Sequence, residues 1–262
     1  MTAAGASERL DQALLARALA PSRQRAQAMI AAGLVEVDGR TAGRAAARVT
    51  PATVLRIVGP DHPWAGRGGL KLDAALEEFG IACDGRVCLD AGASTGGFTD
   101  VLVSRGAGLV YAVDVGRGQL APRLAALPQV IVLDRTNLRT LRSLPGPSPD
   151  LVTLDLAFIS LRAVLPTVAG LIGAARTADV IALFKPQFEL GRGAVPRGGV
   201  VRDQSAAEAA IAAFLDWCDG ELGATQARPP LRSPVLGAKG NQEWLLHLSL
   251  PGRGVPRGTD EP

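Results

Sequence analysis

The stretch that decides the fold is residues 86–107, RVCLDAGASTGGFTDVLVSRGA. Its first seven residues are an apolar run that ends in an acid and a glycine, which is the pattern of a buried strand. The glycines that follow allow close backbone approach in a turn, and residues 95–107 then carry helical apolar spacing. We therefore expect a strand, a tight turn and a helix in direct succession.

Strands and helices alternate through the rest of the chain. Apolar runs predict further strands at 109–116, 130–133, 149–158, 179–188 and 244–250. Helical spacing predicts one helix from about Ser160 and another over 203–219, with Asp203 near its start. This alternation predicts an α/β fold of the Rossmann-like class, with a doubly wound, mostly parallel sheet.

The front of the chain has a different pattern. Helical spacing over 8–19 and 22–33 is followed by LVEVDGR, which alternates into an Asp-Gly hairpin turn, and by VLRIV at 54–58. Two short helices and a hairpin predict a small N-terminal α+β domain. The expected boundaries are 1–58 for this domain, 59–69 for a glycine- and proline-rich linker, 70–251 for the α/β domain and 252–262 for a disordered tail.

The basic excess of the chain lies in its first quarter. Residues 1–62 contain eight arginines and five acids, whereas the remainder contains 20 basic and 20 acidic side chains. A basic front on a neutral body predicts a module that binds a polyanion such as RNA. The candidate RNA contacts are Arg9, Arg17, Arg23 and Arg25, together with Arg67 in the expected linker.

Several classes of protein are not indicated. The chain has no run of 18 apolar residues and no secretory pattern at its start, so no membrane partner is expected. Three cysteines and two histidines are too scattered for a disulfide framework or a metal site. We expect a cytoplasmic protein without a metal.

The turn after the first strand is the expected cofactor site. It is not the Gly-x-Gly-x-x-Gly pattern of dinucleotide sites, and an acid at the end of the first strand, just ahead of the first glycine, is typical of S-adenosylmethionine sites. Asp114, at the end of the next strand, is placed to accept hydrogen bonds from ribose hydroxyls. Glycine turns also occur in other parallel-sheet enzymes, so this segment alone does not identify the cofactor. The candidate residues are Asp90, Gly92, Ala93, Ser94, Thr95, Gly96, Gly97 and Asp114.

Lysine is rare in this chain, with three lysines against 25 arginines. Arginine cannot release its proton near neutral pH, so a retained lysine points to a need for a deprotonatable amine. Lys71 and Lys185, with Asp155 and Glu243, fall where the fold would aim them at one crevice, and such a network can orient or deprotonate a ribose 2′-hydroxyl. The alternative is a set of ordinary buried salt bridges. Lys239 has no assigned role.

These motifs resemble a known family. The runs GRGGLKL, LDAGASTGGFTD, AVDVGRGQL, DRTNLR, LDLAFISL, FKPQFELG, GVVRD and GNQEW are similar to those of the TlyA family, haemolysin-labelled rRNA 2′-O-methyltransferases among the FtsJ-like methyltransferases. The front resembles the S4-like RNA-binding domain, including the serine and arginine that open its second helix. The resemblance covers about residues 8–250.

The resemblance implies a function and a set of roles. It implies a Lys71–Asp155–Lys185–Glu243 catalytic tetrad, S-adenosylmethionine as cofactor, and methylation of a cytidine ribose in the RNA of ribosomal subunits. It also places Asp134 and Asn137 beside the adenosine. Two residues depart from the family, because Gly66 replaces a usual serine before Arg67 and Asp134 replaces a more usual glutamate.

Three other functions share parts of this pattern. They are an RNA-binding ribosome-assembly factor with weak or no catalysis, a haemolysin as the family label suggests, and a small-molecule methyltransferase. An intact tetrad disfavours the first, the absence of an apparent membrane-active segment disfavours the second, and the basic front disfavours the third. The target nucleotide, the ribosomal subunit and the oligomeric state are left open.

Overall fold

A computed structural model describes residues 7–20, 22–31, 33–58, 62–174, 176–190, 195, 198–237 and 240–253. The chain divides into two compact units, and the boundary along the sequence falls between Pro63 and Trp64. Each unit has buried apolar clusters of its own. The second unit therefore begins before the expected start at residue 70, and its first helix already begins at Gly68, inside the expected linker.

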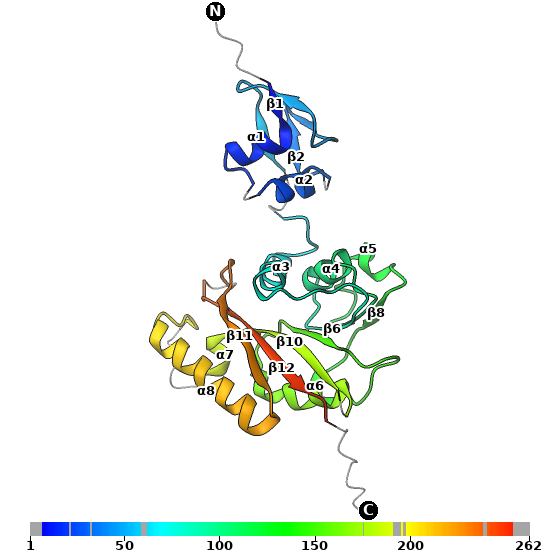
Figure 1. The fold of residues 1–262 in the computed structure, drawn as a ribbon, viewed down its shortest axis with the longest axis vertical. Helices are drawn as coiled ribbons and strands as arrows, with labels where there is room; N and C mark the ends of the chain where they lie inside the picture. Colours follow the sequence, from blue (N-terminus) through cyan, green and yellow to red (C-terminus); the bar gives the residue numbers. More distant parts are fainter. Residues whose placement is uncertain are drawn as a thin grey trace, which may run out of the picture. The chain divides into compact units, whose positions relative to one another are not determined.

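The N-terminal unit combines two short helices with two small sheets. Its helices are α1 (Leu10–Ala16) and α2 (Arg23–Ala31). Its strands are β1 (Glu8–Arg9), β2 (Val35–Val37), β3 (Arg40–Thr41), β4 (Arg48–Val49) and β5 (Leu55–Ile57), in the orders β3-β2-β5 and β1-β4. Apolar side chains from both helices and from β2 form the core. Figure 1 shows this unit in blue.

The predicted hairpin is confirmed. Asp38 and Gly39 both have positive φ, at 49° and 78°, as the two central positions of a type I′ turn require. One expectation was wrong at the start of the unit. Glu8 and Arg9 are not helical, because their backbone pairs with β4 in an antiparallel ladder and α1 begins only at Leu10.

The C-terminal unit contains a seven-stranded sheet in the order β11-β12-β10-β9-β6-β7-β8. The strands are β6 (Val87–Ala91), β7 (Leu109–Val113), β8 (Val130–Leu133), β9 (Leu151–Leu154), β10 (Thr177–Phe184), β11 (Thr225–Arg232) and β12 (Trp244–Pro251). Strands β6 to β10 are parallel, whereas β12 runs antiparallel to both of its neighbours. The predicted doubly wound, mostly parallel sheet is confirmed.

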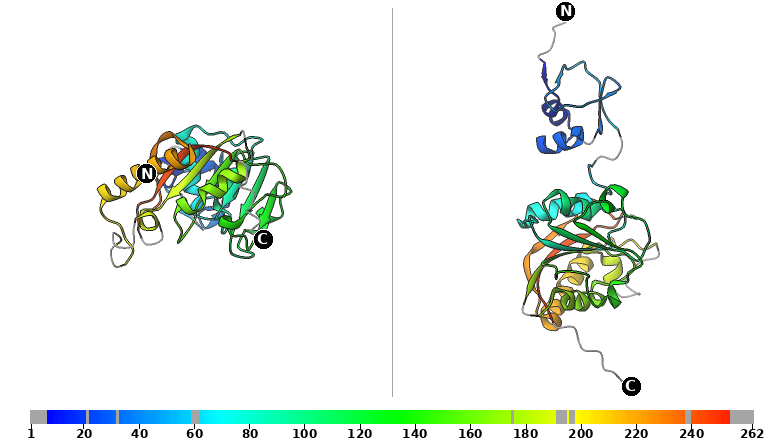
Figure 2. Two further views of the ribbon diagram at one scale, coloured as in Figure 1. Left: turned by 90° about the horizontal axis from the view of Figure 1, so that it is seen from below. Right: turned by 90° about the vertical axis from the view of Figure 1, so that its right-hand side faces the viewer.

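Helices cover both faces of this sheet. One face carries α3 (Gly68–Phe79), α4 (Gly97–Ser104) and α5 (Pro122–Ala125). The other carries α6 (Leu165–Ile172) and α8 (Gln204–Leu222), with the short α7 (Pro186–Glu189) beside α8. Figures 1 and 2 show the two helical layers with the sheet between them. Two 3-10 turns, η1 (Leu138–Thr140) and η2 (Leu161–Ala163), complete the unit.

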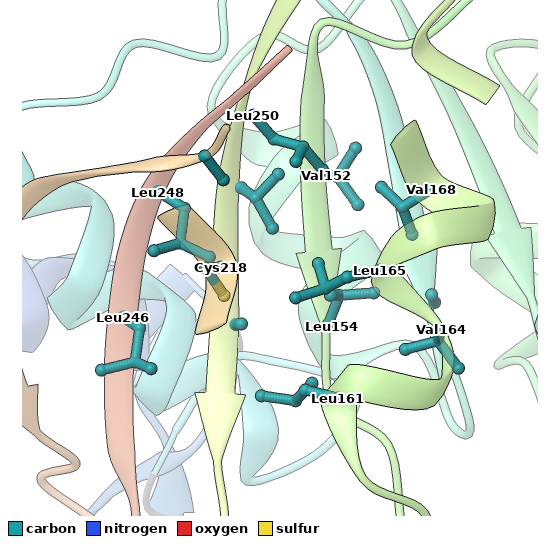
Figure 3. Packing of buried hydrophobic residues seen from close by; sticks show 14 of the residues in the cluster. Val152, Leu154, Leu161, Val164, Leu165, Val168, Cys218, Leu246, Leu248 and Leu250 are labelled. Atoms are coloured by element: carbon teal, nitrogen blue, oxygen red, sulfur yellow. The ribbon is translucent and has the colours of Figure 1, made fainter. Parts of the chain in front are cut away.

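Both faces of the central strands are buried, and their side chains alternate between two clusters. In β12, Leu246, Leu248 and Leu250 enter the cluster under α6 and α8, whereas Leu245 enters the cluster under α3 and α4. Figure 3 shows the first cluster, with Cys218 of α8 facing the β12 leucines. Successive side chains point to opposite faces of the sheet, and both faces are buried. These strands therefore have nearly continuous apolar sequences.

Some boundaries differ from the expected ones. Strand β10 stops at Phe184 because Pro186 opens α7. Strand β11 was missed, since its sequence TQARPPLR is exposed almost throughout and prolines are tolerated at a sheet edge. Gly252 and Arg253 were expected in a disordered tail, but their backbone N–H groups donate to the carbonyls of Arg176 and Ala169. Residues 254–262 lie outside the described residues.

Within the described ranges, no helix combines the length and apolar character needed to cross a membrane.

Candidate active site

The candidate site lies where the strand order reverses. Strand β6 has β7 on one side and β9 on the other, so the chain winds away from it in both directions. Side chains at the carboxyl ends of these strands line a crevice, which is where open parallel sheets bind ligands. The backbone N–H of Asp155, just after β9, donates to the carbonyl of Ala91 in β6 at 3.0 Å. The turn after β6 and the end of β9 are therefore adjacent.

Glycine is required in the turn after β6. Gly92 has a φ of +87°, and a Cβ added there would lie 2.4 Å from the carbonyl oxygen of Asp155. At Gly97, an added Cβ would lie 2.9 Å from the backbone nitrogen of Gly69. Main-chain atoms cause both overlaps, so no side-chain rotation relieves them. The sequence GASTGG thus lets this turn pass close to β9 and to α3.

Most of the predicted cofactor residues line two cavities at this turn. The larger, of about 560 Å³, is lined by Gly92, Ser94, Asp114 and Asn137 among others. The smaller, of about 130 Å³, is lined by the predicted residues Gly92, Ala93, Ser94, Thr95 and Gly97 and by the segment 66–68. Most of the predicted cofactor residues therefore lie around one continuous part of the sheet edge.

Asp114 is fixed at the end of β7. Its Oδ2 accepts a hydrogen bond from the backbone N–H of Ser94 at 2.8 Å, and its Oδ1 accepts one from Gly116 at 2.7 Å. Each carboxylate oxygen retains a further lone pair, so the side chain can still accept from two hydroxyls. Asn137 caps η1 by accepting from the N–H of Arg139 at 3.0 Å.

Three predicted cofactor residues do not line these cavities. Gly96 is the N-cap of α4, and Asp134 accepts from the N–H of Gly118 at 2.7 Å. Asp90 is fully buried beneath the turn. It accepts from the hydroxyls of Thr99 at 2.6 Å and Thr153 at 3.2 Å. Burial raises the pKa of Asp90 to about 6. Asp90 thus fastens α4 and β9 to β6, and its carboxylate is not exposed for a ligand.

The four tetrad residues come together. Lys71 on α3, Asp155 after β9, Lys185 after β10 and Glu243 before β12 all line one cavity of about 550 Å³. They form two ion pairs, in which Lys71 Nζ lies 2.6 Å from Glu243 Oε2 and Lys185 Nζ lies 2.6 Å from Asp155 Oδ1. The cavity shares Ser94, Asp155, Ala157 and Phe158 with the cavity lined by Asp114.

Backbone groups lie against both pairs. Lys185 Nζ also donates to the carbonyl oxygen of Leu156 at 2.7 Å. An ammonium has three hydrogens, so one remains for a ligand in the cavity. At Gly237, an added Cβ would lie 2.4 Å from Glu243 Oε1, so the loop before β12 passes directly against this carboxylate. Neither lysine is a surface cation, because Lys71 is 8% exposed and Lys185 is 9% exposed.

Two further parts of the cavity wall were not predicted from the sequence. Asn241 is 2% exposed and joins two loops, since its amide donates to the carbonyl of Gly199 at 2.8 Å and accepts from the N–H of Val201 at 2.8 Å. Phe158 is 90% exposed with a φ of 63°, and its ring lies 5.4 Å from that of Phe188. The polar Gly-Asn-Gln run before a buried strand could have indicated Asn241, but no periodic pattern indicates Phe158.

The segment before α3 is part of the site wall. Arg67 lines both the tetrad cavity and the small cavity at the glycine turn. Asp100 on α4 holds this segment by accepting from the N–H of Ala65 at 2.8 Å. A Cβ at Gly66 would lie 2.6 Å from Thr95 Oγ1. The departure from the family at Gly66 therefore removes a contact with the turn, and a serine here would require Thr95 to move.

The candidate RNA contacts of the N-terminal unit differ in what they bind. Arg9 and Arg23 both donate to the carboxylate of Asp11. Arg17 instead donates to the carbonyls of Thr53 at 2.7 Å and Thr50 at 2.8 Å, which is a structural role in the turn after β4. Arg25 lies on α2. Lys239 lies outside the described residues.

Both units of the chain are similar to known proteins. Residues 64–250 match the FtsJ-like methyltransferase model, and residues 8–55 match the S4 domain model. The 16S/23S rRNA (cytidine-2'-O)-methyltransferase TlyA of Mycobacterium tuberculosis is 48% identical, over 92% of this chain and 89% of that protein. Hemolysin A of Brachyspira hyodysenteriae is 35% identical, over 92% of this chain and 100% of that protein.

A solved structure is also similar. A haemolysin-labelled protein from Streptococcus thermophilus shares 33% sequence identity with this chain and superposes with a TM-score of 0.70. The match covers 97% of this chain and 92% of that protein. The family model spans the whole C-terminal unit up to the last strand, and the sequence relatives extend over both units. The chain therefore belongs to the FtsJ-like methyltransferase family, among the TlyA proteins that carry an S4 domain in front.

Proposed function

We propose that this protein is an S-adenosylmethionine-dependent methyltransferase that modifies the ribose 2′-hydroxyl of a cytidine in ribosomal RNA. The observation that carries this function is the tetrad cavity, which contains two lysine–carboxylate pairs. This cavity adjoins the one lined by Asp114, and Ser94 and Asp155 line both. The 48% identical relative, named for cytidine 2′-O-methylation of 16S and 23S rRNA, supports the same substrate.

The residues around the glycine turn fit S-adenosylmethionine. A cavity of about 560 Å³ is within the usual range for a cofactor of this size. Gly92 has no side chain to fill it, and Asp114 keeps acceptor capacity for ribose hydroxyls. Asp114 would hold the ribose, Asn137 would lie by the adenine, and Ser94 would contact the part nearest the tetrad. When bound, the cofactor supplies an activated methyl group, so alignment is the main task of the protein.

Lys185 is the residue that orients the hydroxyl. Asp155 and the carbonyl of Leu156 take two of its hydrogens, which leaves the third for the 2′-oxygen. When the Lys185 amine is neutral, it can also accept the proton of the 2′-hydroxyl. An arginine cannot do this, because it stays protonated. Lys71 and Glu243 complete a balanced set of charges, so that a buried cation does not stand alone.

The surface around the cavity suits an unpaired nucleotide. The exposed ring of Phe158, beside Phe188, offers an apolar face on which a base can stack. Arg67 lines the same cavity and carries a positive charge for a phosphate. RNA capture also uses the basic N-terminal unit, whose S4 domain match supports RNA binding.

A methylation assay with mapping tests this function. The purified full chain is mixed with S-adenosylmethionine carrying a tritiated methyl group and with small subunits, large subunits or deproteinised rRNA. Digestion to nucleosides and mass spectrometry then identify the product. We expect 2′-O-methylcytidine at one position in each modified RNA. Label on a base, label on another nucleoside, or no transfer to any ribosomal substrate would contradict the proposal.

A further inference from the structure

The N-terminal unit contains a fully buried carboxylate, that of Asp11 in the first turn of α1. A buried charge is costly unless it is paired and its lone pairs are satisfied. Asp11 meets this requirement with side chains from two other elements, namely Arg9 of β1 and both Arg23 and Gln27 of α2. One carboxylate therefore connects β1, α1 and α2.

The contacts bring two guanidinium groups to the same oxygen. Arg9 binds Asp11 in a bidentate manner, with Nε 2.9 Å from Oδ1 and NH2 3.0 Å from Oδ2. Arg23 Nε lies 3.0 Å from Oδ2, and Gln27 Nε2 lies 2.8 Å from the same oxygen. Arg23 and Gln27 are four residues apart, so they lie on one face of α2. Asp11 thus sets the position of Arg9 relative to Arg23.

The charge between the two arginines permits their approach. Two guanidinium groups repel each other at short range, and the carboxylate between them offsets this repulsion. The pKa of Asp11 lies well below its usual range, mainly because Arg9 donates hydrogen bonds to the carboxylate. The hydrogen bonds from Gln27 and Arg23 lower this pKa further. Asp11 is therefore ionised throughout the neutral range, and the three charged groups together carry one positive charge.

Within the described residues, Asp11 takes fewer than half of the donors of this pair. A guanidinium has five N–H groups, of which Arg9 uses two and Arg23 uses one for Asp11. The side chains are 33% and 51% exposed, so their outer edges face solvent. A phosphodiester carries one negative charge and accepts parallel N–H bonds from guanidinium edges, which matches this pair in charge and in geometry.

We propose that Asp11 is a positioning residue that joins Arg9 and Arg23 into one binding site for a phosphate of the RNA backbone. This role rests on the proposed function, in which ribosomal RNA is the substrate. Arg17 is not part of the site, because it is directed to the carbonyls of Thr50 and Thr53.

A substitution that removes the negative charge of Asp11 tests this role, because a net-charge effect and a positioning effect would change the KM in opposite directions. Asp11→Asn keeps the shape of the side chain and makes the unit more positive by one charge. If the unit held RNA by net charge alone, this change would leave the KM for ribosomal subunits unchanged or lower it. If Asp11 positions the two arginines, the KM rises about tenfold despite the added positive charge, with kcat and the cofactor Kd unchanged.

Asp38→Asn is the matched control. Asp38 is exposed on the hairpin turn of the same unit, and its Oδ1 accepts from the N–H of Val54 at 2.8 Å. Asparagine can keep this bond and tolerates the positive φ of 49°. The variant therefore adds the same charge without disturbing Arg9 or Arg23, and we expect a KM equal to or below that of the wild type.

Two further variants keep the test decisive. Arg23→Lys retains the charge but loses the planar fork, so its KM should rise severalfold. The double variant with Asp11→Asn and Arg23→Lys should be no worse than the poorer single variant, since both act through one site. Thermal unfolding establishes whether Asp11→Asn is folded. If it is not, Arg23→Lys alone decides, and an unchanged KM overturns the proposal.

The remaining outcomes are also informative. A KM for folded Asp11→Asn that matches Asp38→Asn, or effects that multiply in the double variant, would overturn the positioning role of Asp11. The wild-type chain is assayed first on the same subunits. A wild type without methyl transfer to rRNA contradicts the proposed function, whereas an active wild type with insensitive variants contradicts only this inference.

Discussion

Lys185 Nζ donates to the backbone carbonyl oxygen of Leu156 at 2.7 Å. A main-chain acceptor sets the direction of the amine independently of the neighbouring carboxylate, Asp155, which takes a second hydrogen at 2.6 Å. The side chain is thus held from two sides at the end of β10, and its free direction is defined by the fold. This arrangement suits a group that must orient a hydroxyl, because small misplacements of a reacting group lower the rate strongly.

The first prediction concerns Gly92. In Gly92→Ala, the new Cβ would lie 2.4 Å from the carbonyl of Asp155, at a φ of +87°. We expect cofactor affinity to fall at least tenfold, and the free energy of unfolding to fall by roughly 2–4 kcal/mol. Isothermal titration calorimetry with S-adenosylmethionine and denaturant unfolding measure the two effects.

Gly80→Ala is the matched control for this change. Gly80 also has a positive φ, at 67°, but an added Cβ meets nothing within 4 Å. It should cost only about 1–2 kcal/mol of stability and leave cofactor binding intact. Equal effects of the two variants on cofactor affinity would show that the close approach to Asp155 does not shape the site.

The second prediction concerns pH and Asp90. Burial raises the pKa of this carboxyl to about 6 in the folded chain, from an ordinary value of 3.8. The folded state therefore binds the proton more tightly than the unfolded state. The resulting stabilisation is fully present below pH 3.8 and is lost as the pH rises through 6. A shift of this size corresponds to about 3 kcal/mol.

Asp90→Asn removes this pH dependence. All other titratable groups contribute equally to the unfolding free energies of the variant and the wild type. Their contributions therefore drop out when one free energy is subtracted from the other. We expect this difference to shift in favour of the variant by roughly 2–2.5 kcal/mol between pH 4 and pH 7.5, measured by urea unfolding. A difference that stays constant over this range would mean that Asp90 titrates alike in both states.

The third prediction separates Arg17 from the RNA contacts. Arg17→Ala removes the two donors that hold the carbonyls of Thr50 and Thr53. We expect a loss of about 1–3 kcal/mol in the stability of the N-terminal unit, without a change in the salt dependence of RNA binding. Arg56→Ala, at an exposed position on β5, should leave stability nearly unchanged. A lower salt slope for Arg17→Ala, with stability intact, would instead assign Arg17 to RNA.

Much of the sheet could be predicted because both faces of its strands are buried. Runs such as VCLDA and DVIALF are mostly apolar, and Asp90 and Asp155 mark the ends of β6 and β9 beside the crevice. The edge strand β11 could not be predicted, since its exposed residues need no apolar alternation. The extended conformation of Glu8–Arg9 could not be predicted either, because it depends on pairing with β4, which lies about 40 residues further along the chain.

The site was predictable where residue type alone indicates chemistry. Two of the three lysines, Lys71 on α3 and Lys185 just after β10, lie at positions that the fold brings into one cavity. The burial of Asp90 was not predictable, because it depends on the hydroxyls of Thr99 and Thr153, which come from α4 and β9. The roles of Arg17 and Asn241 depend on backbone carbonyls, which the sequence does not reveal.

The most direct measurement is single-turnover methyl transfer by Lys185→Met with the mapped ribosomal substrate. Methionine keeps the bulk of the side chain but donates to neither Asp155 nor the carbonyl of Leu156. We predict a rate at least about 10²-fold below that of the wild type, with the Kd for S-adenosylmethionine unchanged within about twofold. A transfer rate close to that of the wild type, in a variant that is folded and binds the cofactor, would contradict the account.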